Sequence, residues 1–378
     1  MFSLEIPQEI EELLSKLEVY QYESYIIGQG VADLILGREP YIWKVATNAS
    51  YQEIVQIFPQ TFFTATSDDH ITVVLWQRPI EVISLGSLTL QKYLSSYSFS
   101  LETLAYDWNQ KKVIDFLDAR NDLKEKTIRL LPCPAILFRQ QPIEMLRTIR
   151  LGTQYQFFIP DKIIKEIRTH HTLLQQVQLE KVRDELALIL LAPKPSPYLD
   201  ILSLTEIIQL FLPEVEEALH YQIESDFSLG KHLFLTVDYL PPDLEIRLVG
   251  LFHDLGKTLL KPTLRGKEII YPGHEELSAQ MGKKILNRLN FFTKVVGHSI
   301  NHHKIISLIK NHMFSYNPST TTDKGIERLI ARVGIENIQS LLNLRKANIL
   351  AGSQAKQSKM SFYHSLERHL KRFLKNYN

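Results

Sequence analysis

The hydrophobic periodicity of this chain changes near residue 117, and the change limits the folds that it can adopt. Before it, short apolar runs alternate with helical stretches; after it, apolar residues recur with helical spacing almost to the C-terminus. The first part predicts helices over 9–17 and 31–36 and strands over 25–27, 45–47, 71–76, 80–83 and 112–116. We therefore predict an α+β protein: a small mixed α/β head built on a β-sheet, followed by a long all-α body.

Two of the predicted strands, 71–76 and 80–83, are separated by only three residues. So short a connection is typical of a β-hairpin. Proline cannot donate to a strand ladder, so we expect Pro79 to lie at the turn.

Length and composition describe a globular chain of more than one domain. A chain of 378 residues is too long for one ordinary hydrophobic core. Its composition, 44% apolar and 22% charged residues, excludes a disordered or fibrous protein. Lys and Arg number 43 against 42 Asp and Glu, which excludes a histone-like basic binder. The single Cys133 excludes an internal disulfide and a cysteine-rich zinc site, and no run of about 18 uncharged apolar residues occurs. We expect a soluble cytoplasmic protein without a membrane segment.

Several segments carry a distinctive order of residues. Residues 28–38 read GQGVADLILGR, 45–49 read VATNA, 104–107 read LAYD and 183–186 read RDEL. This order resembles the class II tRNA nucleotidyltransferases (CCA-adding enzymes) and the bacterial poly(A) polymerases, whose motifs include Gly-Gly-Ala-Val-Arg-Asp, Leu-Gly-Arg and Ile-Ala-Thr-Asn-Ala. The resemblance covers essentially the whole chain. It implies a nucleotidyltransferase-like head and a role in binding or processing RNA, with a tRNA-like 3′ end as the partner.

In that family an Asp-x-Asp pair on a strand holds the two divalent cations that nucleotidyl transfer requires. The two-residue period of a strand places both carboxylates on one face. By the resemblance, the matching positions here are Ile42 and Lys44. An apolar side chain cannot ligate magnesium and an ammonium group repels it. We therefore expect no magnesium at the head and no nucleotidyl transfer.

Other motifs of the family are altered as well. Gln29 stands at a glycine position, Ser96-Tyr97-Ser98 aligns with Arg-Arg-Asp, and the stretch 140–144 aligns with the base-reading Glu-Asp-x-x-Arg. Carboxylates displaced to Asp68 and Asp69 are an alternative, but neighbours on a strand face opposite sides of a sheet. We expect a turn at that position instead.

Some family positions are retained, and the resemblance makes them candidate nucleotide or RNA contacts. They are Gly28, Asp33, Asn48, Arg147 and Arg150. Residues of these types also cap helices, form turns and pack, so a purely structural role is the alternative.

The histidines are concentrated late in the chain, where nine of the thirteen fall at or after position 232. His253-Asp254 ends an apolar helical run over 244–252, with Gly256 suited to its C-terminal cap. Adjacent His and Asp at a helix end resemble the signature of HD domains, which are metal-dependent phosphohydrolases. His232, the segment GHEE at 273–276 and the segment NHM at 311–313 resemble, in order, the HD domain attached to many CCA-adding enzymes.

The resemblance to HD domains implies a set of metal ligands. They are His232, His253, Asp254, His274 and Asn348. HD domains usually have an aspartate at the last position, and the uncharged amide of Asn348 should lower metal affinity. Two interpretations stay open: a bound divalent metal, or a vestigial domain whose histidines cap helices. Lys257 is a candidate phosphate contact.

A second histidine group, His298, His302 and His303, is predicted to share one helix with i, i+4 spacing. Two of its members could ligate a metal. Such residues more often form a polar helix face, which is the interpretation we favour.

Basic residues gather in two places. Between 123 and 150 six Lys and Arg stand against two Glu, and a helix starting after Pro142 places Arg147 and Arg150 on one face. By the resemblance, this neck lies beside the primer end of the RNA. From 351 onward six Lys and Arg stand against one Glu, interleaved with Phe and Tyr that can stack on bases. A solvated helix face has the same composition.

We predict four segments: a degenerate nucleotidyltransferase-like head at 1–116, a helical, RNA-binding neck and body at 117–225, an HD-type helical domain at 226–355, and a basic tail at 356–378. Three functions are compatible with them. The first is a diverged tRNA nucleotidyltransferase-family protein that binds or processes RNA without polymerising. The second is an HD phosphohydrolase acting on a phosphomonoester or cyclic phosphate. The third is an active CCA-adding or poly(A) enzyme whose carboxylates lie elsewhere. The oligomeric state does not follow from the sequence.

Overall fold

The computed structural model describes residues 4–59, 61–63, 71–224, 226–265, 268–314, 316–352 and 360–376. The alternative carboxylates Asp68 and Asp69 lie outside these residues. The chain forms two compact units: 1–137 with 157–160, and 138–156 with 161–378.

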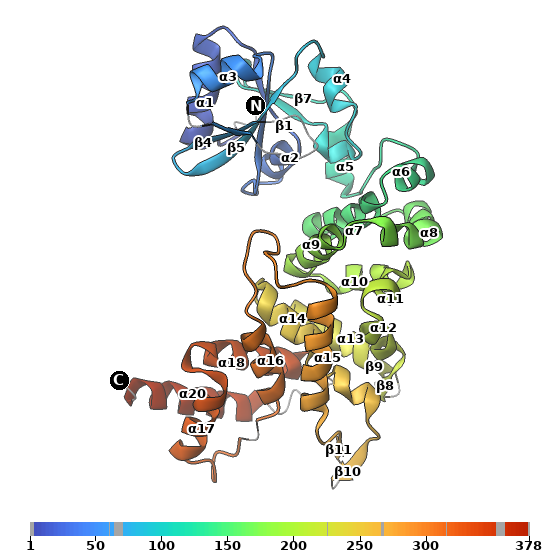
Figure 1. Cartoon of the computed structure of the whole chain (residues 1–378), viewed down its shortest axis with the longest axis vertical. Coiled ribbons are helices and arrows are strands. Elements are labelled where there is room, and N and C mark those ends of the chain that lie inside the picture. Colours follow the sequence, from blue (N-terminus) through green and yellow to red (C-terminus); the bar gives the residue numbers. More distant parts are fainter. Residues whose placement is uncertain are drawn as a thin grey trace. The chain divides into compact units, whose positions relative to one another are not determined.

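A mixed β-sheet forms the centre of the first unit (Figure 1). In the described part its strand order is β3-β4-β5-β2-β1-β6-β7. The strands are β1 (Ser24–Ile27), β2 (Trp43–Thr47), β3 (Thr61–Phe63), β4 (Ile71–Leu75), β5 (Arg78–Ser84), β6 (Ala105–Asp107) and β7 (Lys112–Ile114). The pairing of β2 with β5 is parallel and the other pairings are antiparallel.

Short helices accompany the sheet, and their sequences explain their ends. They are α1 (Gln8–Val19), α2 (Gln29–Ile35), α3 (Tyr51–Ile57), α4 (Leu90–Leu94), the 3₁₀ turn η1 (Ser100–Glu102) and α5 (Ala119–Glu125). Helix α1 buries Ile10, Leu13, Leu14 and Leu17, a stripe with helical spacing. Helix α3 begins at a capping box in which Ser50 and Glu53 satisfy each other's backbone N–H groups.

The hairpin of β4 and β5 confirms the predicted pairing but not the predicted turn. Its two connecting residues, Trp76 and Gln77, have φ angles of 52° and 65°. Turns with two positive φ angles match the twist of the flanking strands. Pro79 lies inside β5, opposite Val74, so the expectation that it forms the turn was wrong. A proline is tolerated there because β5 pairs with β2 only from Ile80 onward, so Pro79 has a neighbouring strand on one side alone.

The second unit is helical, as predicted, with two small hairpins that the periodicity did not indicate. Its helices are α7 (Ile143–Tyr155), α8 (Asp161–His170), α9 (Leu179–Leu191), α10 (Ser196–Leu204), α11 (Ile207–Phe211), α12 (Pro213–His220), α13 (Leu229–Asp238), α14 (Leu244–Phe252), α15 (His274–Arg288), α16 (His302–Asn311), α17 (Asp323–Val333), α18 (Ile338–Leu350) and α20 (Met360–Asn376), with 3₁₀ turns η2 (His171–Gln176), η3 (Leu255–Leu259) and η4 (Ile335–Asn337). The hairpins pair β8 (Gln222–Glu224) with β9 (Phe227–Ser228) and β10 (Thr263–Arg265) with β11 (Glu268–Ile270). Helix α6 (Pro134–Gln140) spans the boundary of the two units.

A buried arginine joins helices inside the second unit. Arg247 of α14 is 2% exposed and donates to the carbonyl oxygens of Leu190 and Ala192, at the end of α9. Burial lowers the pKa of Arg247 to about 10, although Asp238 raises it. Buried guanidinium groups are tolerated where carbonyl acceptors satisfy their donors, so this residue fixes α14 against α9.

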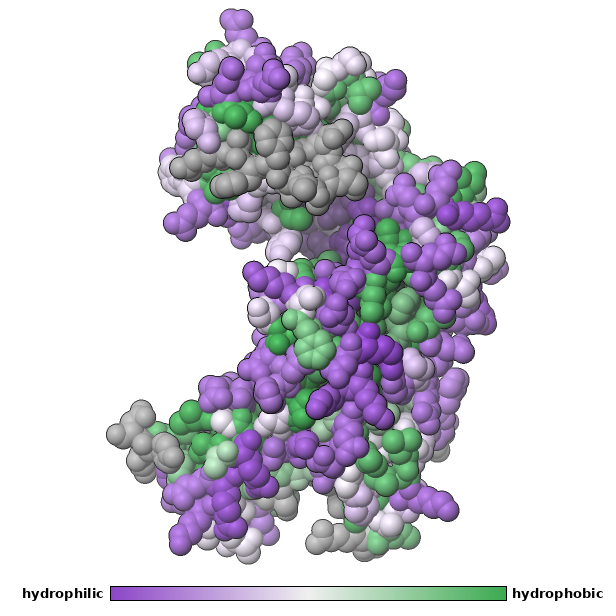
Figure 2. All heavy atoms as spheres, viewed as in Figure 1, coloured by the Kyte–Doolittle hydropathy of each residue, from purple (hydrophilic) through white to green (hydrophobic). Residues whose placement is uncertain are grey.

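Hydrophilic side chains dominate the face of the molecule drawn in Figure 2, and apolar residues lie on it in small groups. Among the helices of the described residues, none combines the length and the apolar character that crossing a membrane requires.

Candidate metal centre

Four helices of the second unit bring five buried side chains together. His232 lies on α13, His253 and Asp254 follow the last residue of α14, His274 is the first residue of α15, and His312 caps the end of α16. The residues are between 0% and 4% exposed. We call them the histidine cluster.

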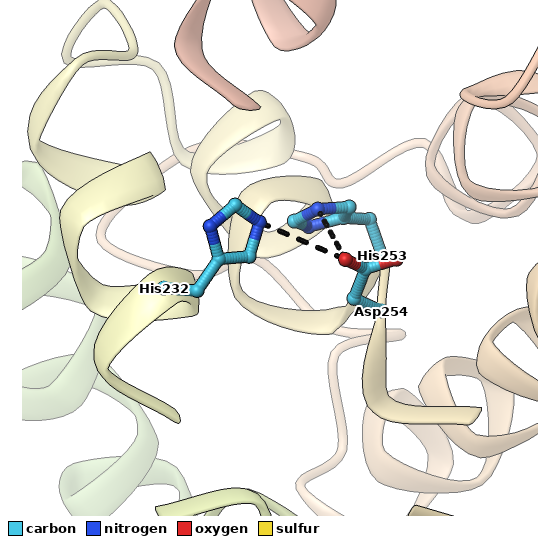
Figure 3. Close-up of side chains that lie close together, drawn as sticks. All are labelled: His232, His253 and Asp254. Atoms are coloured by element: carbon cyan, nitrogen blue, oxygen red, sulfur yellow. Dashed lines mark ion pairs between the residues drawn. The ribbon is translucent and has the colours of Figure 1, made fainter. Parts of the chain in front are cut away.

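The carboxylate of Asp254 lies at the middle of the histidine cluster. Its Oδ1 is 3.0 Å from Nε2 of His274 and 3.3 Å from Nε2 of His312. Its Oδ2 is 3.4 Å from Nε2 of His253 and 3.6 Å from Nε2 of His232. Figure 3 shows the rings of His232 and His253 turned toward this carboxylate from two different helices. The four imidazoles therefore divide into two pairs, one at each carboxylate oxygen.

Backbone carbonyl groups orient three of the rings. The Nδ1 atoms of His253, His274 and His312 lie 2.9, 2.7 and 2.6 Å from the carbonyl oxygens of Gly250, Tyr271 and Ile309. A carbonyl oxygen only accepts, so Nδ1 carries the proton in each ring. When these rings are neutral, each Nε2 presents a lone pair to the cluster. Imidazole ligands of metals are commonly held in this way. Nδ1 of His232 lies 3.4 Å from the carbonyl oxygen of Ala351.

The nitrogen and oxygen atoms of the histidine cluster do not satisfy one another's capacity for hydrogen bonds. Nε2 of His253 and Oδ1 of Asp254 are buried and make no hydrogen bond among the described residues. Nε2 of His274 and Nε2 of His312 lie 3.3 Å apart, a distance at which two lone pairs repel. Buried polar atoms without partners are rare in folded proteins. A cation bound among these atoms would remove both defects, so the residues present fit a divalent metal.

The charge state of the cluster also suits a cation. Burial raises the pKa of Asp254, but Lys257 and the neighbouring histidines outweigh it, so this pKa is held well below its ordinary range. Burial lowers the pKa of His312, which keeps the ring neutral, while the contact with Asp254 acts in the other direction. An ionised carboxylate beside the neutral ring of His312 offers two of the donor types that borderline transition metals prefer.

Lys257 lies beside the cluster on η3. Its ammonium group forms a short ion pair with Oδ2 of Asp254 and lies 5.7 Å from the centre of the Tyr271 ring. Its side chain is 18% exposed. Lys257, the candidate phosphate contact, is therefore ion-paired with the carboxylate of Asp254.

Asn348, the remaining predicted ligand, is half-buried on α18. It stands three residues before Ala351, whose carbonyl oxygen faces His232. His312 takes a place in the cluster that the predicted ligand set did not give it. The sequence signal for His312 is the segment NHM at 311–313, which resembles HD domains.

Gly256 does not cap α14, contrary to the prediction, because α14 already ends at His253. A Cβ at Gly256 would lie 2.7 Å from the backbone nitrogen of Ser278, so the glycine allows η3 to approach α15 closely.

The second histidine group does not share one helix, so that prediction was wrong. Helix α16 begins at His302, while His298 precedes it in an isolated bridge with Val295. Nε2 of His302 contacts the carbonyl oxygen of Phe291 at 3.1 Å, and His303 is exposed. Asn301 caps the helix in front of them.

In the first unit, the positions matched to Asp-x-Asp hold no carboxylate. Ile42 is 45% exposed just before β2. Nζ of Lys44, on β2, forms an ion pair of 2.9 Å with Glu81, its register partner on β5. Gln29 donates to Glu102 at 2.9 Å. Lys44 and Gln29 therefore each have a carboxylate partner inside the unit.

The retained family positions of the first unit have structural roles. Gly28, with φ of 80°, begins α2, and its N–H donates to Leu104. Asp33 is 5% exposed on α2. The side chain of Asn48 accepts from the backbone N–H of Glu23.

The two predicted basic contacts lie on α7. Arg150 is 9% exposed and pairs with Glu185 of α9 at 2.7 Å. Arg147 is more exposed and pairs with Glu144 of its own helix at 2.6 Å. Arg150 is therefore a packing residue, whereas Arg147 lies nearer the surface.

Known protein families match two parts of the chain. Residues 156–219 match the family described as "Probable RNA and SrmB- binding site of polymerase A", and residues 230–341 match the HD domain family. The second range contains the whole histidine cluster and ends before Asn348.

Curated relatives match part of the chain. A CC-adding tRNA nucleotidyltransferase of Halalkalibacterium halodurans is 30% identical over 179 residues, 47% of this chain and 47% of the relative. A CCA-adding enzyme of Ligilactobacillus salivarius is 27% identical over 251 residues, 60% of this chain and 61% of the relative. The chain spans about half the length of most of the curated relatives it matches.

Solved structures match over nearly the whole chain. The CCA-adding enzyme of Bacillus stearothermophilus in complex with CTP superposes with a TM-score of 0.65 at 18% identity, covering 94% of this chain and 81% of that one. The Thermotoga maritima CCA-adding enzyme complexed with tRNA gives 0.57 at 18% identity, covering 95% and 82%. These likenesses confirm the predicted architecture, a mixed-sheet head followed by a helical body with an HD domain.

Proposed function

The chain belongs to the tRNA nucleotidyltransferase family and carries an HD domain, and from this premise we propose that it binds RNA but no longer transfers nucleotides. The match of residues 156–219 to an RNA-binding family supports RNA as the partner. A tRNA-like 3′ end is the proposed target, supported by the relatives that are described as acting on or bound to tRNA. We also propose the segment boundaries and the cytoplasmic location given above for the sequence.

One observation carries the loss of transfer. Lys44 occupies a position where the family needs a carboxylate, and its ammonium forms an ion pair with Glu81 at 2.9 Å. An ammonium group beside the remaining carboxylate repels a divalent cation and competes for its ligand. Ile42, at the other position, offers no ligand atom. This part of the sheet therefore lacks the means to hold the cations that activate a 3′-hydroxyl.

Incorporation of labelled CMP or AMP into tRNA lacking its 3′ end tests this proposal, with magnesium or manganese present and an active CCA-adding enzyme in parallel. We expect no incorporation above the no-protein control, together with a measurable gel shift of the same tRNA. Incorporation that is lost when Glu81 is changed to Gln would overturn the loss of transfer. A tRNA that is not shifted would overturn RNA binding.

The histidine cluster favours a second function, the metal-dependent hydrolysis of a phosphomonoester or cyclic phosphate. His232, His253, Asp254, His274 and His312 would hold the ion. A bound divalent ion supplies a hydroxide nucleophile near neutral pH by lowering the pKa of its water. Asp254 would orient the ligand set through both carboxylate oxygens, and the backbone carbonyls keep the rings in the required tautomer. Lys257, at the edge of the cluster, would receive the phosphate.

Hydrolysis of p-nitrophenyl phosphate and of a nucleoside cyclic phosphate, with manganese, cobalt or nickel added, tests this second function. We expect metal-dependent turnover that Asp254→Asn removes and that Glu81→Gln, in the other unit, leaves unchanged. Turnover that survives Asp254→Asn would exclude the cluster as its source.

A further inference from the structure

We propose that a pocket of the head binds an extended, proline-rich segment of another protein, with a Lys or Arg next to the prolines. The pocket has a volume of about 350 Å³ and lies where β2 and β5 begin. Its lining residues are Glu39, Pro40, Tyr41, Trp43, Arg78 and Pro79. The inference depends neither on the RNA binding nor on the metal proposed above, because it uses other residues.

Strand geometry separates this pocket from the positions matched to Asp-x-Asp. Neighbouring residues of a strand point to opposite faces of the sheet, so Trp43 and Lys44 lie on different faces. Lys44 shares its face with Glu81, its register partner. Arg78 stands three residues before Glu81 in β5 and therefore lies on the other face, where its Nε atom is 2.8 Å from Glu9 of α1. The pocket is thus on the α1 side of the sheet.

Two buried donors of the pocket have no acceptor among the described residues. Trp43 is 2% exposed, and its indole Nε1–H makes no hydrogen bond to any of them. Nη1 of Arg78 is likewise buried and makes none to them, although the other nitrogens of this guanidinium pair with Glu9 and Glu39 at 2.8 and 3.4 Å. Leaving a buried donor without an acceptor costs free energy. A ligand that brings acceptor atoms into the pocket would remove this cost.

A proline-rich segment is a ligand that offers acceptors without donors. Proline has no backbone N–H, and a polyproline II helix makes no internal hydrogen bonds, so its carbonyl oxygens stay free. An α-helix has already used most of its carbonyl oxygens, and a β-strand brings N–H groups that need acceptors of their own. The two donors at Trp43 and Arg78 therefore match the polyproline II backbone better than either regular alternative.

The rings around the pocket suit the same ligand. Tyr41 is 74% exposed, so one aromatic ring is open to a partner, and Pro40 and Pro79 line the pocket with it. Polyproline II segments dock in grooves lined by aromatic side chains, because their own rings pack on these flat surfaces without losing much conformational entropy. The shape and the donors thus indicate one class of peptide.

Charge favours a basic peptide over RNA. Among the described residues that line the pocket, Arg78 is the one cation, and two carboxylates, of Glu9 and Glu39, already face it. Helix α1, which supplies Glu9, carries four Glu and one Lys. A phosphate at the pocket would meet an excess of negative charge and be repelled, whereas a Lys or Arg would be attracted. The side chain of Glu39 is 78% exposed and is the expected contact of that basic residue.

Titration of the full-length chain with synthetic ligands tests the inference. The probes are a hexaproline with two C-terminal arginines, the same hexaproline with two C-terminal glutamates, a glycine-serine peptide with the two arginines, and oligouridylate. We expect the arginine-tailed hexaproline to bind at least about tenfold more tightly than each of the other three, because only it supplies both the acceptors and the positive charge.

Variants locate the binding in the pocket. Trp43→Phe, which removes the indole N–H and keeps an aromatic ring, should weaken binding of the arginine-tailed hexaproline about tenfold. Tyr41→Ala should weaken it by about the same factor through the lost ring surface. Glu39→Gln should reduce the preference for the arginine tail over the glutamate tail. Tyr20→Ala, at a tyrosine that is 59% exposed and outside the pocket, is the matched control and should change nothing.

A measurement on the unmodified chain covers the case in which Trp43→Phe fails to fold. The chain has three tryptophans, so a heteronuclear correlation spectrum contains three indole N–H signals, which Trp76→Phe and Trp108→Phe assign by elimination. Binding should move the Trp43 signal downfield, because its N–H gains an acceptor, and leave the Trp108 signal in place.

Three results would overturn the inference. The arginine-tailed hexaproline fails to bind, or it binds without moving the Trp43 signal, or it binds the Tyr41→Ala variant as tightly as the unmodified chain. Tight binding of oligouridylate that Tyr41→Ala removes would replace a protein by RNA as the ligand of this pocket. Because nucleotidyl transfer and metal binding are measured separately, none of these results decides the functions proposed above.

Discussion

The polar groups of the head sheet and those of the histidine cluster are arranged in opposite ways. In the head, the carboxylate of Glu81 faces the single ammonium group of Lys44, and Gln29 donates to Glu102, although Oε2 of Glu81 also makes no hydrogen bond to a described residue. In the cluster, by contrast, four imidazoles surround the one carboxylate of Asp254, and Nε2 of His253 and Oδ1 of Asp254 make no hydrogen bond among the described residues. Groups that satisfy one another need no ligand, whereas buried groups that do not are costly unless something binds them. The comparison supports the proposal that the helical unit, and not the head, holds a divalent metal.

The largest expected effect is the loss of metal binding in Asp254→Asn. The amide keeps the shape of the side chain but removes the charge that both imidazole pairs share. Changing a group that only orients a ligand typically costs 10–100-fold in metal affinity, so losing this ligand should cost at least about a hundredfold. Calorimetry with Co²⁺ measures the effect, with Glu81→Gln in the head as control. An unchanged affinity would remove the contrast between the two regions.

Arg150→Ala should lower stability by about 2 kcal/mol, because it leaves Glu185 in a largely buried position without its partner. The side chains of Arg150 and Glu185 are 11% and 15% exposed. Arg168→Ala on α8 is the control, with a loss of about 0.5 kcal/mol at most, because its pair with Glu206 is 57% and 38% exposed. Urea unfolding compares the two. Equal losses would contradict the packing role assigned to Arg150.

Asn348→Asp should strengthen metal binding about tenfold, since an anionic oxygen is a better ligand than a neutral amide. The position lies three residues before Ala351, whose carbonyl oxygen is 3.4 Å from Nδ1 of His232. Asn343→Asp on the same helix adds the same charge and serves as control. If both variants tighten binding alike, the effect is one of general charge and Asn348 is not a ligand position.

The smallest effect is expected in the head, where Ile42→Asp with Lys44→Asp should restore no nucleotidyl transfer. The residues at 140–144 that align with the base-reading motif remain altered, so restored carboxylates alone are insufficient. Removing the half-exposed pair with Glu81 should cost stability by no more than about 1 kcal/mol. CMP and AMP incorporation and thermal unfolding check these two statements. Recovered incorporation would show that only the metal ligands had been lost.

The order of helices and strands could be predicted because it depends on local patterns. The apolar stripe of α1 and the apolar run of α14 each appear in the sequence with their own spacing. The adjacent His253 and Asp254 likewise mark the centre of the cluster without any knowledge of the fold. The lack of carboxylates at positions 42 and 44 also follows from the sequence alone, since the apolar side chain of Ile42 and the ammonium of Lys44 cannot ligate magnesium in any conformation.

Contacts between distant segments could not be predicted in the same way. The place of His312 in the cluster and the packing of Gly256 against α15 each depend on a second segment farther along the chain. The same is true of Arg150, because its basic side chain alone does not indicate the pairing with Glu185 of α9. Residue type and spacing therefore determined the fold class, the family and the identity of most cluster residues. The pairing of charges from distant segments, as in Arg150 with Glu185 and Lys44 with Glu81, was decided only by tertiary structure, because the fold and not the spacing in sequence brings these side chains together.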